Sequence, residues 1–265
     1  PASILPVVVF PQCFMPKSIM DAGVLIKKTI VFFLLVLKGK GRYSFLMTSV
    51  TLVFFSLLPF LAWFFYCLIH KHAVMLHLPG FFGAALIAAA FSVAARFVLE
   101  PFAVFFPPAV LPLFIALAVT AIPEEATKLL AVIPFSRSGP GRSPLPERAL
   151  LARAVCISLA FSSLENIFFA AKFPGSLPLR FGTAVPLHAS LAVFSACWLS
   201  GRLNRGRFAP GFRMLVAAIC LHALYALGFE LRPIFAGLSV FTATVAFIGA
   251  VVLWNTCGDD DGQRS

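Results

Sequence analysis

The sequence predicts an all-α protein, a polytopic transmembrane helix bundle with about seven spans, six to eight being the range. Three observations predict this fold class. Of the 265 residues, 60% are hydrophobic and 12% are charged, whereas soluble domains carry about 25% charged residues. The mean hydropathy is +0.97. The apolar residues form runs close to the roughly 20 residues with which a helix crosses a bilayer. The composition therefore excludes an ordinary water-soluble domain and a disordered chain, and it implies a surrounding lipid bilayer.

Seven apolar runs define the expected spans, and together they form one membrane-embedded domain over residues 45–257. The short turn from Glu230 to Pro233 makes the last two spans an antiparallel hairpin. Residues 1–44 are expected to be an interfacial segment or to follow a wrongly assigned start, because the apolar stretch Thr29–Leu37 is too short to span. Residues 258–265 are an acidic polar tail. The spans cover residues 45–69, 81–99, 109–135, 149–171, 182–200, 212–230 and 234–254.

The basic residues predict the orientation of the bundle. The net charge is +11, but most lysines and arginines lie in short segments between the spans, which excludes nucleic acid as a partner. Alternating the spans places ten basic residues on one side and seven on the other, with Arg96 and Arg180 among the seven. The positive-inside rule puts the side with ten, and the C-terminal tail, in the cytoplasm.

The third span contains the motif EExxK, and its charges require an explanation. A charged side chain at the bilayer centre costs about 2.5–3.5 kcal/mol on the insertion scale, so such groups face the bundle interior and have partners. Glu124 and Glu125 lie four and three residues before Lys128, so either can pair with it. Pro123 removes a backbone donor and is expected to bend the helix. Lys128 neutralises one carboxylate, and the other needs another partner or a proton. An ion pair with a purely structural role is the alternative.

The next three spans add further polar side chains within apolar helices. The fourth carries Phe161 and Glu165 on one face, with Asn166 adjacent, and the fifth and sixth carry His188 and His222. Taken singly, each is typical of a packing residue. Acids and imidazoles from four successive spans together predict a shared polar pocket, where such groups hold a metal, move protons or activate water. The helical zinc motif HExxH is absent.

Four motifs occur in order on these spans: EExxK at 124–128, FxxxEN at 161–166, PLH at 186–188 and LHxLY at 221–225. Over residues 109–229 the chain thereby resembles the PrsW-type intramembrane proteases of the CAAX protease and bacteriocin-processing superfamily. The resemblance implies an intramembrane peptidase. Its substrate would be a membrane-anchored protein like an anti-sigma factor, cleaved in a stress response at the inner (cytoplasmic) membrane of a bacterium.

The resemblance also implies a set of site residues. The catalytic candidates are Glu124, Glu125, Lys128, Glu165, His188 and His222. Zinc, held by Glu165, His188 and His222, is one expectation for the cofactor, and a metal-free mechanism is the other. Our hypothesis for the roles has Glu124 and His188 activating water, His222 assisting the oxyanion and Lys128 holding Glu125.

The chain departs from the superfamily at Ala226, four residues after the last histidine, where many members have Asn or Asp. The departure removes a candidate oxyanion donor or ligand, for which Asn166 is a possible substitute. Two other functions stay open: a catalytically inactive scaffold that binds helices, which Ala226 suggests, and a proton-coupled transporter, in which buried Glu and His residues relay protons. A transporter would usually show a pseudo-symmetric duplication, which the sequence lacks.

Overall fold

The computed structural model describes residues 42–69, 78–138, 143–172, 177–205, 209–231 and 236–256. The chain divides into two compact units, Pro1–Thr51 and Leu52–Ser265. Every candidate site residue belongs to the second unit. The expected acidic tail, and all of the expected N-terminal segment except residues 42–44, lie outside the described residues.

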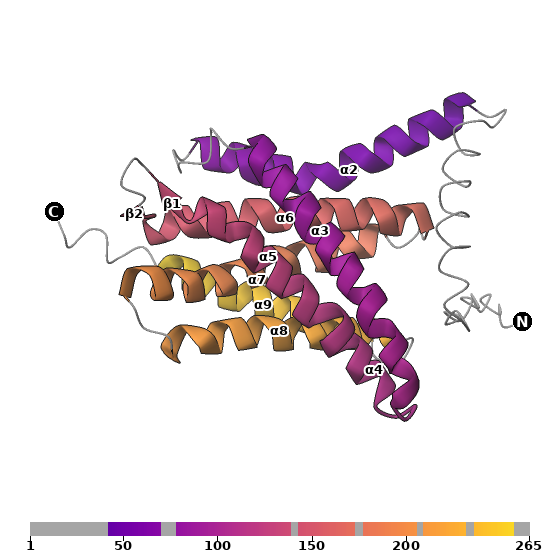
Figure 1. The fold of residues 1–265 in the computed structure, drawn as a ribbon. Coiled ribbons are helices and arrows are strands. Elements are labelled where there is room, and N and C mark those ends of the chain that lie inside the picture. Colours follow the sequence, from indigo (N-terminus) through magenta and orange to yellow (C-terminus); the bar gives the residue numbers. More distant parts are fainter. Residues whose placement is uncertain are drawn as a thin grey trace, which may run out of the picture. The chain divides into compact units, whose positions relative to one another are not determined.

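The described residues are almost entirely helical, as the sequence predicts (Figure 1). Within the described ranges, five helices are long and apolar enough to cross a membrane, and the part Val53–Ile69 forms a shorter apolar helix. The predicted third span is a helix with interruptions, and it carries the charged EExxK motif. This architecture is consistent with the predicted number of about seven spans. The helices are α2 (Arg42–Ile69), α3 (Leu78–Leu99), α4 (Leu111–Phe114), α5 (Ile122–Val132), α6 (Glu147–Lys172), α7 (Leu177–Arg205), α8 (Ala209–Glu230) and α9 (Ala236–Thr256).

Short elements connect or interrupt these helices. They are the 3₁₀-helices η2 (Glu100–Phe105) and η4 (Ile133–Phe135), the π-helix η3 (Ile115–Ala121), and the strands β1 (Arg137–Ser138) and β2 (Ser143–Pro144), which pair antiparallel.

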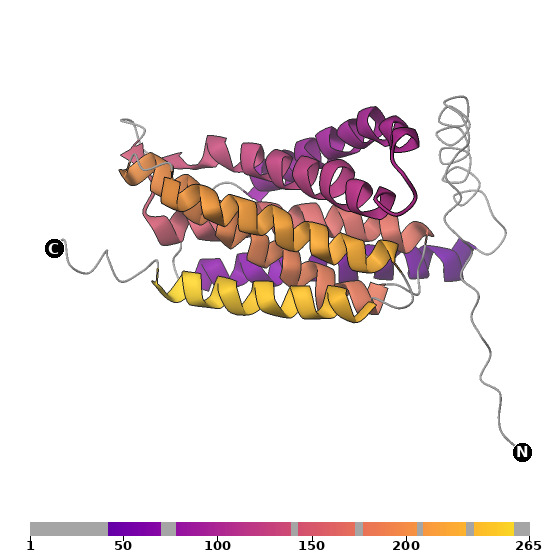
Figure 2. The same cartoon turned by 90° about the horizontal axis from the view of Figure 1, so that it is seen from below.

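Helix α7 lies at the centre of the bundle and packs against α6, α8 and α9 (Figure 2). Helix α3 covers α5 and α6, and η3 packs on α8. Small residues let these helices approach closely. At Gly249 of α9, an added Cβ would lie 2.8 Å from the ring of Phe194 on α7. Most side chains of α6 and α7 are buried, whereas α3, α8 and α9 turn large apolar side chains outward, as expected of helices that face lipid.

The helix that carries EExxK changes its hydrogen-bond register just before the motif. The backbone N–H of Ile122 donates to Leu117 O, five residues back, and ends the π-helix η3. Pro123 follows and has no N–H to donate. The ordinary helix α5 resumes there, with Glu124 and Glu125 in its first turn. π-Turns are local and occur often at functional sites, so a π-helix directly before Glu124 and Glu125 favours a functional role for these two residues.

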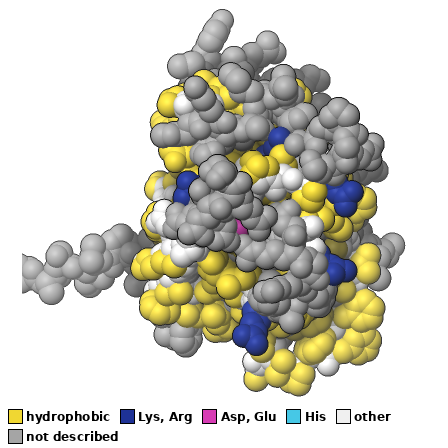
Figure 3. Space-filling model, turned by 90° about the vertical axis from the view of Figure 1, so that its left-hand side faces the viewer, with side chains coloured by type: hydrophobic (Ala, Val, Ile, Leu, Met, Phe, Trp, Pro, Cys, Tyr) yellow, Lys and Arg dark blue, Asp and Glu magenta, His cyan; other side chains and the backbone are white. Residues whose placement is uncertain are grey.

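One end of the bundle is basic. It contains β1, β2, the start of α6, the end of α7 and the start of α8 (Figure 1). Lysine and arginine side chains are spread among hydrophobic ones over this end (Figure 3). It is the side that the sequence places in the cytoplasm. The basic residues of these elements whose side chains the structure describes are Arg137, Arg148, Arg153, Arg202 and Arg213.

Candidate functional site

The six candidate residues lie together inside the bundle. The first turns of α5 supply the two glutamates and the lysine of EExxK, and the last third of α6 supplies Glu165. The middle of α7 supplies His188, and the middle of α8 supplies His222. Five of the six are buried, and the side chain of Glu165 is 20% exposed. The expected convergence of four successive spans is thus seen in the structure.

Glu125 is the centre of one part of the network. Lys128 Nζ forms a short ion pair with Glu125 Oε1, one helical turn away. His222 Nδ1 lies 2.7 Å from the same oxygen. The predicted pairing of Lys128 with one glutamate of the motif therefore falls on Glu125.

Lys128 also fixes the tautomer of His188. Its Nζ lies 3.2 Å from His188 Nδ1. Because a lysine ammonium only donates, Nδ1 must accept, and the ring proton is assigned to Nε2. Nε2 then donates to Glu165 Oε2 at 2.9 Å. A continuous hydrogen-bonded path thus runs from His222 through Glu125, Lys128 and His188 to Glu165.

Glu124 is paired with Arg96, which lies in the predicted span 81–99 and was counted from the sequence among the basic residues of the outer side. Arg96 Nη2 of α3 donates to Glu124 Oε1 at 2.7 Å and lies 3.4 Å from Thr120 Oγ1. The other oxygen, Glu124 Oε2, is buried and has no hydrogen-bond partner among the described residues. His222 Nε2 lies 3.5 Å from it. The sequence offers Arg96 as a candidate partner, because it lies within an apolar run and the unpaired carboxylate needs a cation, but the pattern is the same for a side chain that turns outward to water.

Glu165 also has an arginine partner, Arg180 of α7. Arg180 Nη2 lies 2.8 Å from Glu165 Oε2, and Arg180 Nε donates to Asn166 Oδ1 at 2.8 Å. The guanidinium also lies 3.8 Å from the centre of the Phe169 ring. Arg180 was expected from the sequence to be one of the basic residues of the outer side. Here its side chain is buried and pairs inside the bundle.

The three acids of the site are therefore balanced by three bases, each acid with its own partner: Glu124 with Arg96, Glu125 with Lys128, and Glu165 with Arg180. Charged groups in a bilayer are tolerated when they are paired in this way. Arg180 is buried and Arg96 is ion-paired with Glu124, so neither is a free charge of the outer side. The excess of basic residues on the opposite side is larger than the sequence count suggested.

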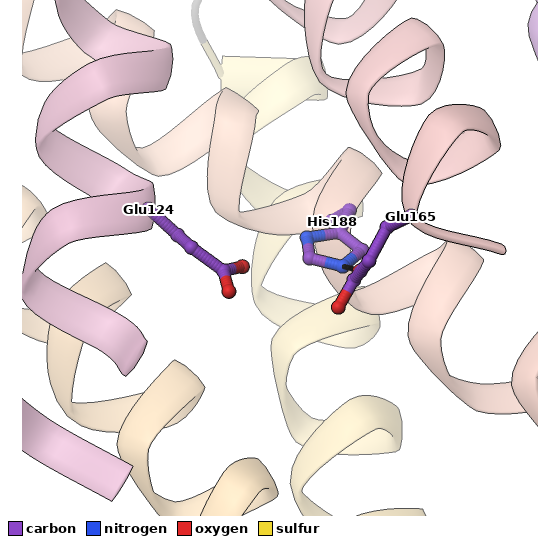
Figure 4. A group of neighbouring side chains, drawn as sticks. All are labelled: Glu124, Glu165 and His188. Carbon is purple, nitrogen blue, oxygen red and sulfur yellow. Dashed lines mark hydrogen bonds and ion pairs between the residues drawn. The ribbon is translucent and has the colours of Figure 1, made fainter. Parts of the chain in front are cut away.

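Three donor atoms, one each from Glu124, Glu165 and His188, lie within 4.8 Å of one another. Figure 4 shows Glu124 reaching from α5 toward His188 and Glu165. Carboxylate oxygen and imidazole nitrogen are suitable zinc ligands. Glu124 Oε2 has no hydrogen-bond partner among the described residues, and Glu165 adds a second carboxylate, so the two acids fit a divalent cation. His188 Nε2 would join them as a ligand only after losing the proton that it donates to Glu165. This set has Glu124 where the sequence hypothesis had His222, which instead contacts Glu125.

The position that departs from the superfamily lies one turn after His222. Ala226 is half-buried. Asn166, proposed as a substitute donor, is fully buried beside Glu165, and its Nδ2 has no partner among the described residues. An amide donor is therefore present on α6, next to a site acid.

A polytopic bundle that encloses paired carboxylates and imidazoles defines an integral membrane protein with an internal polar site. A family model described as "PrsW family intramembrane metalloprotease" matches residues 70–255. No curated protein and no solved structure matches the chain. The chain belongs to the PrsW family of intramembrane metalloproteases, and this membership supports a membrane protease with a protein substrate.

Proposed function

We propose that the protein is an intramembrane peptidase that hydrolyses a peptide bond of a membrane-anchored protein at the Glu/His site between α5 and α8. The observation that carries this proposal is Glu124 Oε2, a buried carboxylate oxygen that has no hydrogen-bond partner in the part of the chain that the structure describes and that is grouped with Glu165 and His188. Such an oxygen is available to a water molecule or to a metal ion. The resemblance supports an anti-sigma-factor-like substrate, a role in a stress response and the inner membrane of a bacterium.

Glu124 is the proposed general base. Arg96 anchors its Oε1, so Oε2 is left to take a proton from water. The water oxygen forms a bond to the scissile carbonyl carbon, and the proton passes from Oε2 to the leaving amine when the C–N bond breaks. His188 is held in position by Lys128 and Glu165, and its ring forms one side of the space that this water would occupy.

His222 is the proposed oxyanion donor. An ionised Glu125 only accepts, so His222 Nδ1 donates to it. In its protonated form, His222 also donates through Nε2, which faces Glu124 Oε2 at 3.5 Å. A carbonyl oxygen that becomes negative beside Glu124 would receive this donor. Glu125 then acts as a positioning residue, since it orients His222 and pairs with Lys128.

Glu124, Glu165 and His188 would hold a metal ion. A bound zinc ion would polarise the scissile carbonyl and make water a stronger nucleophile. The experiment that decides is metal analysis of the purified protein, beside a cleavage assay with and without a chelator. Zinc with chelator-sensitive cleavage supports a metalloprotease, whereas cleavage by metal-free protein supports water activated by Glu124 alone.

The site itself is tested by cleavage of single-span substrate proteins in liposomes. Glu124→Gln should lower kcat by about 10²–10⁴-fold, since the general base is lost while the shape of the side chain is kept. Glu100→Gln is the matched control, because Glu100 is exposed at the start of η2. Wild-type cleavage by Glu124→Gln would refute the choice of base. A cellular effect that survives joint replacement of Glu124 and His222 would favour the inactive scaffold.

A further inference from the structure

A small cavity lies between α5, α6 and α7, beside the Glu125–Lys128 ion pair. Its volume, measured as the space open to the centre of a water molecule, is about 10 Å³. The polar side chains in its wall are Glu125, Lys128, Ser158 and Ser195, and alanines of α6 and α7 form much of the rest. The space is close to the smallest that accommodates one water.

Ser195 is the unusual residue of this wall. It is 6% exposed, and its hydroxyl has no hydrogen-bond partner among the described residues. Several other buried hydroxyls of the bundle bond to the carbonyl four residues back, among them Ser190 to Pro186 O at 2.6 Å and Thr183 to Leu179 O at 2.8 Å. Ser195 makes no such bond, and its Oγ is left at the cavity. A buried hydroxyl in this condition requires a partner.

Lys128 supplies a second group of this kind. An ammonium has three N–H donors. Glu125 Oε1 and His188 Nδ1 accept two of them. The Phe161 ring centre lies 5.3 Å from Nζ, which is a cation–π distance and not a hydrogen bond. The third donor therefore has room for an acceptor on the cavity side.

We propose that this cavity is a binding site for one water molecule, bound by Ser195 Oγ and the Glu125–Lys128 pair. The water accepts from Lys128 and exchanges a hydrogen bond with Ser195, which gives it the two to four partners that buried waters have. It links the cytoplasmic half of α7 to the ion pair and completes the donors of Lys128. Through Lys128 the link continues to His188 and Glu165. The water site rests on this geometry and does not depend on the proposed peptidase activity.

Thermal unfolding of the purified protein distinguishes a wet cavity from a dry one by the sign of the effect. If the cavity is dry, Ser195→Ala removes an unsatisfied hydroxyl, so the Tm should rise or stay the same. With a bound water, the same change removes one of its partners and lowers the Tm by about 2–4 °C. Ser162→Ala is the matched control, because Ser162 is a buried serine of α6 whose hydroxyl also lacks a partner among the described residues but does not line this cavity.

We expect a lower Tm for Ser195→Ala alone, and density for a water within hydrogen-bonding distance of Ser195 Oγ in a high-resolution structure of the wild-type protein. A Ser195→Ala protein that melts no lower than Ser162→Ala overturns the proposal. An empty cavity in the wild-type structure overturns it equally. Both measurements are independent of cleavage, so failure of the peptidase proposal leaves them unchanged.

Discussion

At the scale of single residues, the adjacent acids Glu124 and Glu125 have different partners and therefore different expected roles. Glu125 is shared by Lys128 and His222, and both are buried. Glu124 pairs with Arg96, whose side chain is 37% exposed and which can therefore turn toward water. Loss of Glu125 leaves the buried Lys128 ammonium without its counter-ion and His222 Nδ1 without its acceptor, whereas loss of Glu124 leaves one half-exposed cation.

This difference predicts opposite orders for stability and for catalysis. Glu125→Gln should destabilise the protein by about 3–5 kcal/mol, the usual effect of breaking a buried ion pair. Glu124→Gln should destabilise it far less, because Arg96 reaches solvent. Per folded molecule, kcat should nevertheless fall further in Glu124→Gln. Denaturant unfolding and cleavage on the same preparations measure both effects. A larger loss of kcat in Glu125→Gln would exchange the roles of the two acids.

Arg96 is expected to act through Glu124 as a positioning residue. Arg96→Gln should lower kcat by about 10–100-fold, the usual effect of losing a group that orients a site residue. KM should change little, because the substituted side chain holds a carboxylate and not the substrate. Arg96→Lys should recover part of the activity, since the charge remains and the planar guanidinium is lost. Arg213→Gln, at the exposed start of α8, is the control, and an equal loss there would contradict a specific role for Arg96.

At the scale of elements, the hydrophobic runs predict the helices well and their ends less well. Helix α7 covers Leu177–Arg205 where 182–200 was expected, because its polar ends continue beyond the apolar run. The buried acids and histidines were predictable, since lipid does not tolerate them unpaired. Arg96 and Arg180 were missed because, near the end of an apolar run, a charge that snorkels to water and one that turns inward have the same sequence pattern. The π-helix η3 was missed because a local change of the backbone hydrogen-bond register does not alter the pattern of apolar residues in the sequence. Pro123 indicated only a bend.

The break between η3 and α5 gives a prediction of its own. Pro123→Ala restores a backbone donor, so an ordinary helix becomes possible through Ile122, and the direction of Glu124 should change. Small misplacements of catalytic groups are costly, so kcat should fall by up to about 10²-fold. The thermal stability should hold or rise, since an interior proline is removed. Pro59→Ala, within α2, is the matched control and should leave kcat unchanged. Unchanged kcat in Pro123→Ala would separate the π-helix from the site.

At the scale of the whole molecule, the positions of the two paired arginines along their helices indicate the depth of the site in the bilayer. Arg96 is three residues from the end of α3, and Arg180 is three residues from the start of α7. Three residues of helix span about 4.5 Å, so both arginines lie near one end of the bundle. That end is opposite the basic end with β1 and β2 (Figure 1). Glu124 and Glu165, which they hold, should therefore lie in the non-cytoplasmic half of the bilayer.

The orientation of the bundle predicts where the substrate is cut, because the substrate span meets the site only at the depth in the bilayer at which the site lies. With the basic end inside, the C-terminal side of α9 is cytoplasmic. A green fluorescent protein fused after Thr256 should fluoresce, and alkaline phosphatase fused there should be inactive. The same reporters inserted between α8 and α9 should give the reverse pattern, as the matched control on the other side. Cleavage should then fall near the outer end of the substrate span, which mass spectrometry of the products locates. Fluorescence from the α8–α9 insertion with an active C-terminal phosphatase would invert the bundle and move the expected cleavage site to the cytoplasmic side.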